Sequence, residues 1–318
     1  MGTAFLFPGQ GAQHVGMGRD LYETWEECRV VFERANEALG MDLSGLCFEG
    51  PEGDLVKTVN AQPAILTHSV AVWSLVSSGG LTADRVAGHS VGEYAALVAS
   101  RTLSFEDAVR LVRRRGELMY EAGISHPGTM AAVVGLDEEV VSGICREASG
   151  RGIVQVANLN SLEQIVISGS VPGVEEAERL AREAGAKRVI RLEVSGAFHS
   201  ALMEGAQEGL REALGRVTFG PPEVPVVANV EGRSLAEGEA LRRALDLQLT
   251  SPVRWVSCME TLIHEGCETF IELGPGRVLS GLMRRFDRGK TVHAAGDRES
   301  VEDLRKALGL RGGAESCC

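Results

Sequence analysis

The chain has 318 residues, of which 44% are hydrophobic and 24% charged, and its formal net charge is −12. This length allows one large domain, or a large domain with a smaller one inserted into it. The negative charge disfavours nucleic acid and anionic membranes as partners, no stretch is apolar for long enough to span a bilayer, and we expect no signal peptide because the first residues lack a basic leader.

The seven cysteines are scattered, and none shows the C-x-x-C spacing typical of zinc and redox sites. We therefore expect no metal site, thiols used as small core residues, and a reducing compartment, the cytoplasm. Two of the cysteines, Cys317 and Cys318, follow a glycine-rich stretch. We expect this tail to be loose after about Leu308.

The first predicted elements are a buried strand at residues 5–7 and helices at 17–39 and 62–78. The strand runs into Pro8-Gly9-Gln10-Gly11, a loop whose two glycines let the backbone approach a ligand closely. This loop lacks the Lys-Ser/Thr pair that completes a phosphate loop. Proline is typical of the first turn of a helix, so we expect the second helix to begin at Gln62-Pro63.

A sharp strand-to-helix turn is predicted around Ser90. A short apolar run that ends at Val86-Ala87 meets the stretch Gly-His-Ser-Val-Gly at 88–92, and an alanine-rich helical pattern follows. This context indicates a nucleophile elbow, which exposes the serine hydroxyl beside the free N–H groups of the next helix. Those groups can hold an anion that develops on a substrate carbonyl. An elbow needs one more N–H from another loop, and Gln10 is the candidate donor, with a plain turn there as the alternative.

An amphipathic helix is predicted from Ser104, which forms an N-cap pair with Asp107, to about Glu121. Its apolar stripe contains one charged residue, Arg115, four residues from Leu111. A guanidinium on a buried face is costly unless an anion pairs with it. Either an internal carboxylate satisfies Arg115, or a substrate carboxylate does, and a bidentate fork suits the second role.

From Pro127 onward the pattern changes to strand, helix, strand, strand, helix, strand. The strands are expected at 129–135, 153–157, 164–168 and 187–194, and the helices at 137–148 and 172–184. That order is typical of a ferredoxin-like unit. We therefore expect an α/β fold with a large domain at 1–126 and 195–318 and a ferredoxin-like domain inserted at 127–194.

His199 lies where the chain re-enters the large domain and a loop becomes an amphipathic helix. The positive end of that helix favours the neutral imidazole that a general base needs. Serine followed by histidine also matches the α/β-hydrolase order, so we expect His199 to be the base for Ser90. The remaining elements are predicted as strands at 224–230 and 269–273 and helices at 235–249 and 259–265.

Five motifs follow one another along the chain. They are Phe-Pro-Gly-Gln-Gly at 7–11, Gly-His-Ser-Val-Gly-Glu-Tyr at 88–94, Arg-Gly at 115–116, Ala-Phe-His-Ser at 197–200 and Glu-Leu-Gly-Pro-Gly at 272–276. Read together, they resemble the malonyl-CoA:acyl carrier protein transacylases over nearly the whole length. The resemblance implies an α/β-hydrolase-like core with a ferredoxin-like insertion, which agrees with the elements predicted above.

By this resemblance Ser90 is the nucleophile and His199 its base. Arg115 would grip the free carboxylate of the malonyl group. The backbone N–H groups of Gln10 and Val91 would form the oxyanion hole.

The resemblance also implies that the histidine is oriented by a backbone carbonyl, here that of Gln248, in place of an aspartate. Polar residues that line or brace the family's pocket match Gln62, Asn160 and Gln164. Phe198 departs from the small serine that many members place before the histidine. We expect its bulk to leave little room for an α-substituent on the acyl group.

The expected activity is transfer of a malonyl group from malonyl-CoA to the phosphopantetheine thiol of acyl carrier protein, for fatty acid biosynthesis, by a ping-pong mechanism through a Ser90 ester. The resemblance implies no cofactor and no metal. We expect a cytoplasmic monomer whose partners are acyl carrier protein and a coenzyme A thioester.

Three other interpretations stay open. Ala-Phe-His is also common in malonyl-loading acyltransferases of polyketide synthases, so a free-standing acyltransferase could serve a polyketide line. A serine hydrolase or thioesterase on the same core would not need Arg115. A non-catalytic carrier-binding protein would be expected to lose the Ser-His-Arg set, which this chain keeps.

The carrier proteins of this family are acidic, so a chain of net charge −12 needs a locally positive docking face. Two basic clusters could supply it, namely Lys187 with Arg188 and Arg284 with Arg285.

Overall fold

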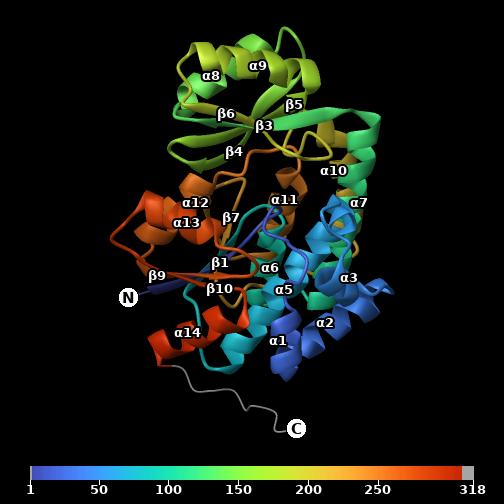
Figure 1. The fold of residues 1–318 in the computed structure, drawn as a ribbon, viewed down its shortest axis with the longest axis vertical. Coiled ribbons are helices and arrows are strands. Elements are labelled where there is room, and N and C mark those ends of the chain that lie inside the picture. The colour runs from blue at the N-terminus through green and yellow to red at the C-terminus, as the bar shows by residue number, and fades with distance from the viewer. Residues whose placement is uncertain (1, 310–318) are drawn as a thin grey trace.

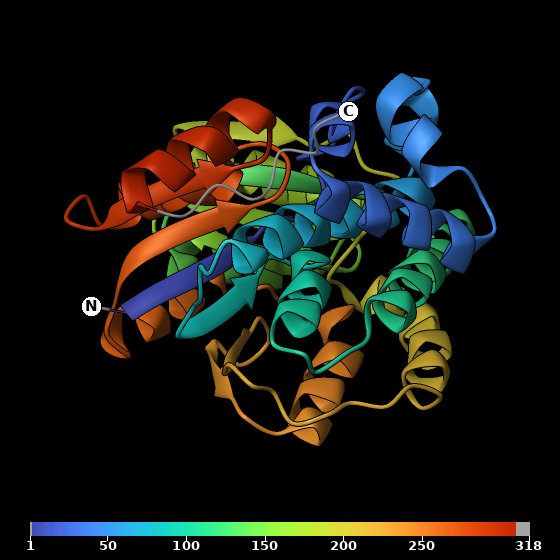
Figure 2. The same ribbon diagram turned by 90° about the horizontal axis from the view of Figure 1, so that it is seen from below.

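Two sheets organise the chain, and the computed structural model describes residues 2–309 (Figure 1). The larger sheet has the strand order β10-β9-β1-β2-β7-β8. Neighbouring strands are parallel except for β7 and β8, which are antiparallel. In Figure 2, β9, β1 and β2 run side by side in orange, blue and teal. The strands are β1 (Gly2–Phe7), β2 (Arg85–Gly88), β7 (Val226–Ala228), β8 (Arg233–Leu235), β9 (Cys267–Leu273) and β10 (Thr291–Ala295).

Helices cover both faces of this sheet. They are α1 (Arg19–Thr24), α2 (Glu26–Leu39), α3 (Leu43–Glu49), α4 (Glu52–Leu55), α5 (Thr58–Ser78), α6 (Gly92–Ala99), α7 (Phe105–Ser125), α10 (Glu204–Leu214), α11 (Gly238–Gln248), α12 (Trp255–His264), α13 (Val278–Phe286) and α14 (Arg298–Leu308), with a 3-10 turn, η1, at Ala201–Met203. Successive side chains of a strand point to opposite faces. Phe5 and Phe7 of β1 therefore enter a large core with α5 and α7, whereas Ala4 and Leu6 enter a smaller core with α12 and α13. Coverage on both faces explains the unbroken apolar run at the end of β1.

The smaller sheet lies at the top of Figure 1 beneath two helices. Its strands β3 (Gly128–Val134), β4 (Val154–Ser161), β5 (Gln164–Ser170) and β6 (Arg188–Arg191) have the order β4-β5-β3-β6 and pair antiparallel throughout. The helices α8 (Glu138–Ala148) and α9 (Val171–Glu183) pack on one face, over Ala131 and Val133. The alternate residues Met130 and Ala132 join the large core instead. The predicted order of strands and helices in this segment is confirmed.

The prediction that α5 begins at Gln62-Pro63 is wrong, because the helix begins at Thr58 and Pro63 lies inside it. A proline inside a helix deprives the carbonyl four residues earlier of its N–H partner. That carbonyl belongs to Val59, and it accepts a hydrogen bond from Nη1 of Arg113 at 3.2 Å. A side chain of the neighbouring helix α7 therefore replaces the missing bond and lets the helix extend through the proline.

Other predicted boundaries also shift, and the helix predicted at 259–265 already begins at Trp255. The helical pattern at 17–39 is divided at Trp25, whose extended backbone separates α1 from α2. The helix predicted from Leu235 begins at Gly238, because Leu235 pairs with Val226 in the sheet. The strand predicted at 224–230 is limited to β7. The predicted loose tail, with Cys317 and Cys318, lies outside the described residues.

Within residues 2–309, no helix is both long and apolar enough to cross a bilayer. The same part of the chain contains no cluster of three or more histidine, cysteine or acidic side chains that could hold a metal ion. The five cysteines described there are free and buried.

Candidate active site

Ser90 stands on a backbone turn that only small neighbours allow. A Cβ atom on Gly88 would lie 2.0 Å from the Gly92 carbonyl, and one on Gly92 would lie 2.2 Å from the carbonyl oxygen of Phe7. Ser90 itself has a φ of 52°, in the left-handed region that a residue with a side chain seldom adopts. The turn between β2 and α6 therefore has the strained geometry of a nucleophile elbow.

Asn229, which follows β7, holds this turn in place. Its Oδ1 accepts a hydrogen bond from the Ser90 amide at 2.7 Å, and its Nδ2 donates to the Gly88 carbonyl at 2.6 Å. The sequence analysis missed this residue. The available signal was a buried polar side chain directly after a strand that neighbours β2, since parallel strands end at the same edge of the sheet.

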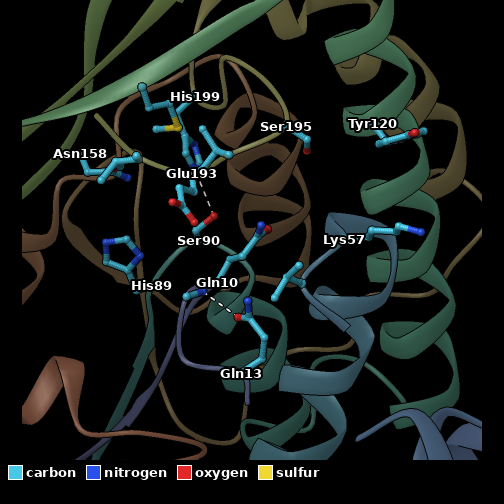
Figure 3. Close-up of a pocket in the computed structure, with 15 residues that line it drawn as sticks. Gln10, Gln13, Lys57, His89, Ser90, Tyr120, Asn158, Glu193, Ser195 and His199 are labelled. Carbon is cyan, nitrogen blue, oxygen red and sulfur yellow. Dashed lines mark hydrogen bonds between the residues drawn. The ribbon is translucent and has the colours of Figure 1, made fainter. Parts of the chain in front are cut away.

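The imidazole of His199 reaches the serine. Its Nε2 lies 2.9 Å from Oγ of Ser90 (Figure 3), and its Nδ1 lies 2.8 Å from the backbone carbonyl of Gln248. A carbonyl only accepts, so Nδ1 carries the proton and Nε2 is free to accept the serine O–H. His199 also has a positive φ, 57°. Both reacting side chains are thus held by unusual backbone conformations.

His199 is neutral at ordinary pH. Burial, and to a smaller extent the nearby Arg115 charge, lowers the pKa of its imidazole to about 3. The sequence analysis attributed a neutral imidazole to the positive end of a helix. In the structure, burial is the larger cause of the lowered pKa, because His199 is only 3% exposed.

Arg115 lies beside the same serine and is 1% exposed. Its Nη1 donates to Oε1 of Gln62 at 2.7 Å, while its Nη2 donates to Oε1 of Gln248 at 2.9 Å and to Oγ of Ser90 at 3.1 Å. The guanidinium also lies 5.9 Å from the ring centre of Tyr94. Within residues 2–309 no carboxylate forms an ion pair with Arg115. The sequence left two possible partners for Arg115, an internal carboxylate or a substrate carboxylate. In the described chain the guanidinium contacts only neutral acceptors, so no internal carboxylate pairs with it directly.

The loop after β1 lies against the elbow, because the His89 amide donates to the Phe7 carbonyl at 2.9 Å. The side chain of Gln10 accepts a hydrogen bond from the Thr58 hydroxyl at 3.0 Å, which fixes the loop to α5. Neither the Gln10 amide nor the Val91 amide has an acceptor in the described part of the chain. Both groups are therefore available to a ligand.

A cavity of about 780 Å³ opens over these groups, between the two sheets. Gln10, Ser90 and His199 line it, together with residues that lie further from the elbow. Figure 3 shows His89 and Asn158 on one side of Ser90, and Lys57 and Tyr120 on the other. Met130 of β3 and the segment 192–195, which follows β6, also line the cavity. The volume is in the range of pockets that hold cofactor-sized ligands.

Of the ten residues that the sequence analysis assigned to the site, only Gln10, Ser90 and His199 line this cavity. Arg115 lies one layer behind it and reaches the cavity through its hydrogen bond to Ser90, while Gln62 and Gln248 hold the guanidinium. Val91 does not line the cavity either, and the remaining three residues lie elsewhere. Phe198 is buried in the large hydrophobic core. Asn160 stands behind His89, with its Oδ1 2.8 Å from Nε2 of that ring. Gln164 pairs with Val134 at the end of β3 away from the cavity. From these positions, Phe198 and Gln164 cannot contact a ligand in the cavity. Asn160 can act on such a ligand only through His89, which lines the cavity.

The comparisons with known proteins agree over nearly the full length. The model of the acyl transferase domain family matches residues 4–307. The chain is 49% identical to the malonyl CoA-acyl carrier protein transacylase of Bacillus subtilis, over 94% of this chain and 95% of that one. It is 44% identical to the Escherichia coli K12 protein of the same name, over 94% and 97% of the two chains.

Solved structures show the same relationship. An acyl carrier protein S-malonyltransferase from Vibrio cholerae superposes with a TM-score of 0.93 at 40% identity, over 96% of this chain and all of that one. A malonyl-transacylase solved in complex with a type II PKS acyl-carrier protein has the same TM-score, identity and coverage. The resemblance carried by the five sequence motifs is thus confirmed. The chain belongs to the acyl transferase domain family and, within it, to the malonyl CoA-acyl carrier protein transacylases.

Proposed function

We propose that this chain transfers a malonyl group from malonyl-CoA to the phosphopantetheine thiol of an acyl carrier protein, through an ester on Ser90. The observation that carries the proposal is the buried Arg115 guanidinium, which lies 3.1 Å from the serine hydroxyl and has no carboxylate partner in the described chain. A buried cation of this kind is strongly stabilised by a ligand anion. Malonyl supplies such an anion, because its second carboxylate projects from the acyl group that the serine attacks.

In the first half-reaction, Nε2 of His199 accepts the proton of Ser90 while Oγ attacks the thioester carbonyl. The developing oxyanion is held by the amides of Gln10 and Val91. The carbon–sulfur bond then breaks, and the coenzyme A thiolate takes the proton from His199. The Arg115 contact to Ser90 Oγ is exchanged for the malonyl carboxylate when the substrate binds.

The second half-reaction reverses these roles. The carrier thiol gives its proton to His199 and attacks the ester carbonyl, and Ser90 leaves with that proton restored. Every bond and proton is accounted for by side chains and the two thiols, so the proposed steps need no cofactor. The relatives include proteins named malonyl CoA-acyl carrier protein transacylase and a malonyl-transacylase solved with a type II PKS acyl-carrier protein. The proposal therefore specifies a carrier protein with a phosphopantetheine thiol and does not assign that carrier to one of the two pathways.

We also assign the folds proposed from the sequence, an α/β-hydrolase-like domain at 1–126 and 195–318 and a ferredoxin-like domain at 127–194. The order β4-β5-β3-β6 with antiparallel pairing supports the second assignment. The elbow at the carboxyl end of the parallel strand β2 supports the first.

Mass spectrometry of the intact protein after mixing with malonyl-CoA tests the proposed activity. We expect one malonyl group on the wild type and none on Ser90→Ala. Addition of a holo carrier protein should move the malonyl group to the carrier faster than water releases it. An adduct that survives in Ser90→Ala would refute the ester on Ser90, and release to water at the same rate with or without carrier would favour a hydrolase.

A further inference from the structure

A second charged group is buried behind the site and takes no part in the steps above. Glu93, in the first turn of α6, is 1% exposed. Its Oε2 accepts hydrogen bonds from Nε2 of Gln248 at 2.8 Å and from the Asn229 amide at 3.1 Å. Its Oε1 has no partner within residues 2–309. A buried carboxylate is costly, so its retention beside the reacting groups calls for a reason.

Gln248 connects Glu93 to the three residues of the proposed chemistry. Its backbone carbonyl holds His199, its Oε1 accepts from Arg115, and its Nε2 donates to the Ser90 carbonyl at 3.1 Å and to Glu93. The side-chain amide could in principle turn over and exchange its oxygen and nitrogen. Arginine only donates and a carboxylate only accepts, so a single orientation of the amide satisfies both neighbours.

The position of the carboxylate matters as much as its charge. If a carboxylate occupied the place of the Gln248 amide, it would pair with Arg115 directly and compete with the ligand carboxylate. Glu93 instead stands one hydrogen bond further away and forms no ion pair with Arg115. The guanidinium is thereby balanced by a nearby negative charge, while its N–H groups donate only to neutral oxygens that a ligand carboxylate can replace.

We infer that Glu93 is a positioning residue for recognition of the malonyl carboxylate, acting through the Gln248 amide. This inference rests on the proposed function. As a carboxylate, Glu93 holds the amide with its oxygen toward Arg115 and offsets the charge of the guanidinium from behind. Without that carboxylate the amide loses its charged acceptor and keeps only the Ser90 carbonyl at 3.1 Å, so its oxygen is held less firmly toward Arg115.

The protonation of Glu93 supports this role. Burial raises the pKa of its carboxyl to about 7, although the Gln248 and Asn229 hydrogen bonds and the Arg115 charge oppose the shift. The other titratable groups that face it are Arg115, Tyr94, Cys258 and Glu231. Burial raises the pKa of the Tyr94 hydroxyl and of the Cys258 thiol, so both stay neutral near pH 7. Burial lowers the pKa of Arg115, but a guanidinium keeps its charge in proteins. Malonyl preference should therefore increase as the pH rises through about 7 and Glu93 loses its proton.

The test compares Glu93→Gln with Glu272→Gln as a matched control. Glu272 is also a fully buried carboxylate, but it accepts from the amides of Leu279 and Ser280 at the start of α13. We measure kcat and KM for loading from malonyl-CoA and from acetyl-CoA across pH 6 to 8 (~one unit either side of neutrality). For Glu93→Gln we expect malonyl kcat/KM to fall at least about tenfold more than acetyl kcat/KM, mainly through KM. Its malonyl-to-acetyl ratio should no longer depend on pH, whereas Glu272→Gln should keep the wild-type ratio and its pH dependence.

A second variant covers the case in which Glu93→Gln does not fold. The double change Glu93→Gln with Gln248→Glu keeps the number of charges and moves the carboxylate into contact with Arg115. We expect this double variant to load acetyl and to lose its preference for malonyl, because the carboxylate at position 248 now occupies the N–H groups of Arg115.

An unchanged malonyl-to-acetyl ratio in a folded Glu93→Gln, or in the double variant, would overturn the inference. Equal losses with both acyl groups would overturn it too, since they would make Glu93 a structural residue only. Failure of the proposed function looks different, because the wild type itself would then form no malonyl ester.

Discussion

Replacing Arg115 by alanine should remove most of the preference for malonyl over acetyl groups. The guanidinium is buried and its hydrogen bonds are all to neutral oxygens, so a ligand carboxylate would be its one direct ionic partner. Breaking such a pair by removing one partner costs about 3–5 kcal/mol. Since about 1.4 kcal/mol is a factor of ten, malonyl kcat/KM should fall by at least about a hundredfold relative to acetyl kcat/KM.

The ratio of the two substrates is the informative quantity. Alanine at 115 also removes the donor to Ser90 Oγ and leaves Gln62 Oε1 and Gln248 Oε1 without their donor, so acetyl loading will fall as well. Single-turnover loading followed by intact mass gives both rates on one preparation. Arg114→Ala is the control, because that side chain is exposed and pairs with Glu117 on the same helix; it should change neither rate more than about twofold. Equal losses of malonyl and acetyl loading in Arg115→Ala would refute the carboxylate-binding role.

Two further predictions concern pH and the carrier. Acetyl loading should stay constant as the pH falls from about 7 to about 5, because the pKa of His199 is lowered to about 3 by burial and the active neutral form persists; a pH profile with a step in the ordinary histidine range would contradict this. Reversing Arg284 and Arg285 to glutamate should slow transfer to an acidic carrier at low salt and spare loading, because both side chains are exposed and neither forms an ion pair within residues 2–309. Lys187→Glu should have the smaller effect, since Lys187 is already paired with Glu163 at 3.2 Å, and equal effects of the two reversals would contradict the assignment.

The parts of the site that the sequence predicted are those with a local signature. The elbow depends on two glycines within five residues, and Arg115 stands out as the charged residue on an apolar stripe, so both can be recognised without long-range information. The βαββαβ order could also be predicted, because apolar residues repeat every second position in strands and at helical spacing in helices. The carbonyl of Gln248 has no side-chain signature, and only the family resemblance pointed to it.

The parts that were missed or misplaced depend on contacts between distant segments. Glu93 and Asn229 are single polar residues 136 positions apart, and their roles emerge only when β7 lies beside β2. Helix α5 was predicted too short because the carbonyl freed by Pro63 is satisfied by a side chain of another helix. Phe198 was placed at the acyl group because it precedes His199, but the positive φ of His199 marks a turn in the backbone there, and the phenyl ring lies in the core.

The carbonyl that holds His199 bears on the direction of the chemistry. An aspartate in that place would stabilise the imidazolium with a full negative charge, whereas a carbonyl offers only a dipole. Burial and the Arg115 charge disfavour the protonated ring as well. The proton therefore remains on the ring briefly, and it passes to the coenzyme A thiolate in loading and to the Ser90 oxygen in transfer to the carrier. Thiols ionise near pH ~8.5 and need little help to leave, and because both carriers are thiols, the second half-reaction is the first one run in the opposite direction. Such a site suits reversible exchange of an acyl group between two thiols whose thioesters have nearly equal energy. It is poorly suited to amides, because an amine leaves only after it has been protonated, and this site stabilises the protonated imidazole weakly.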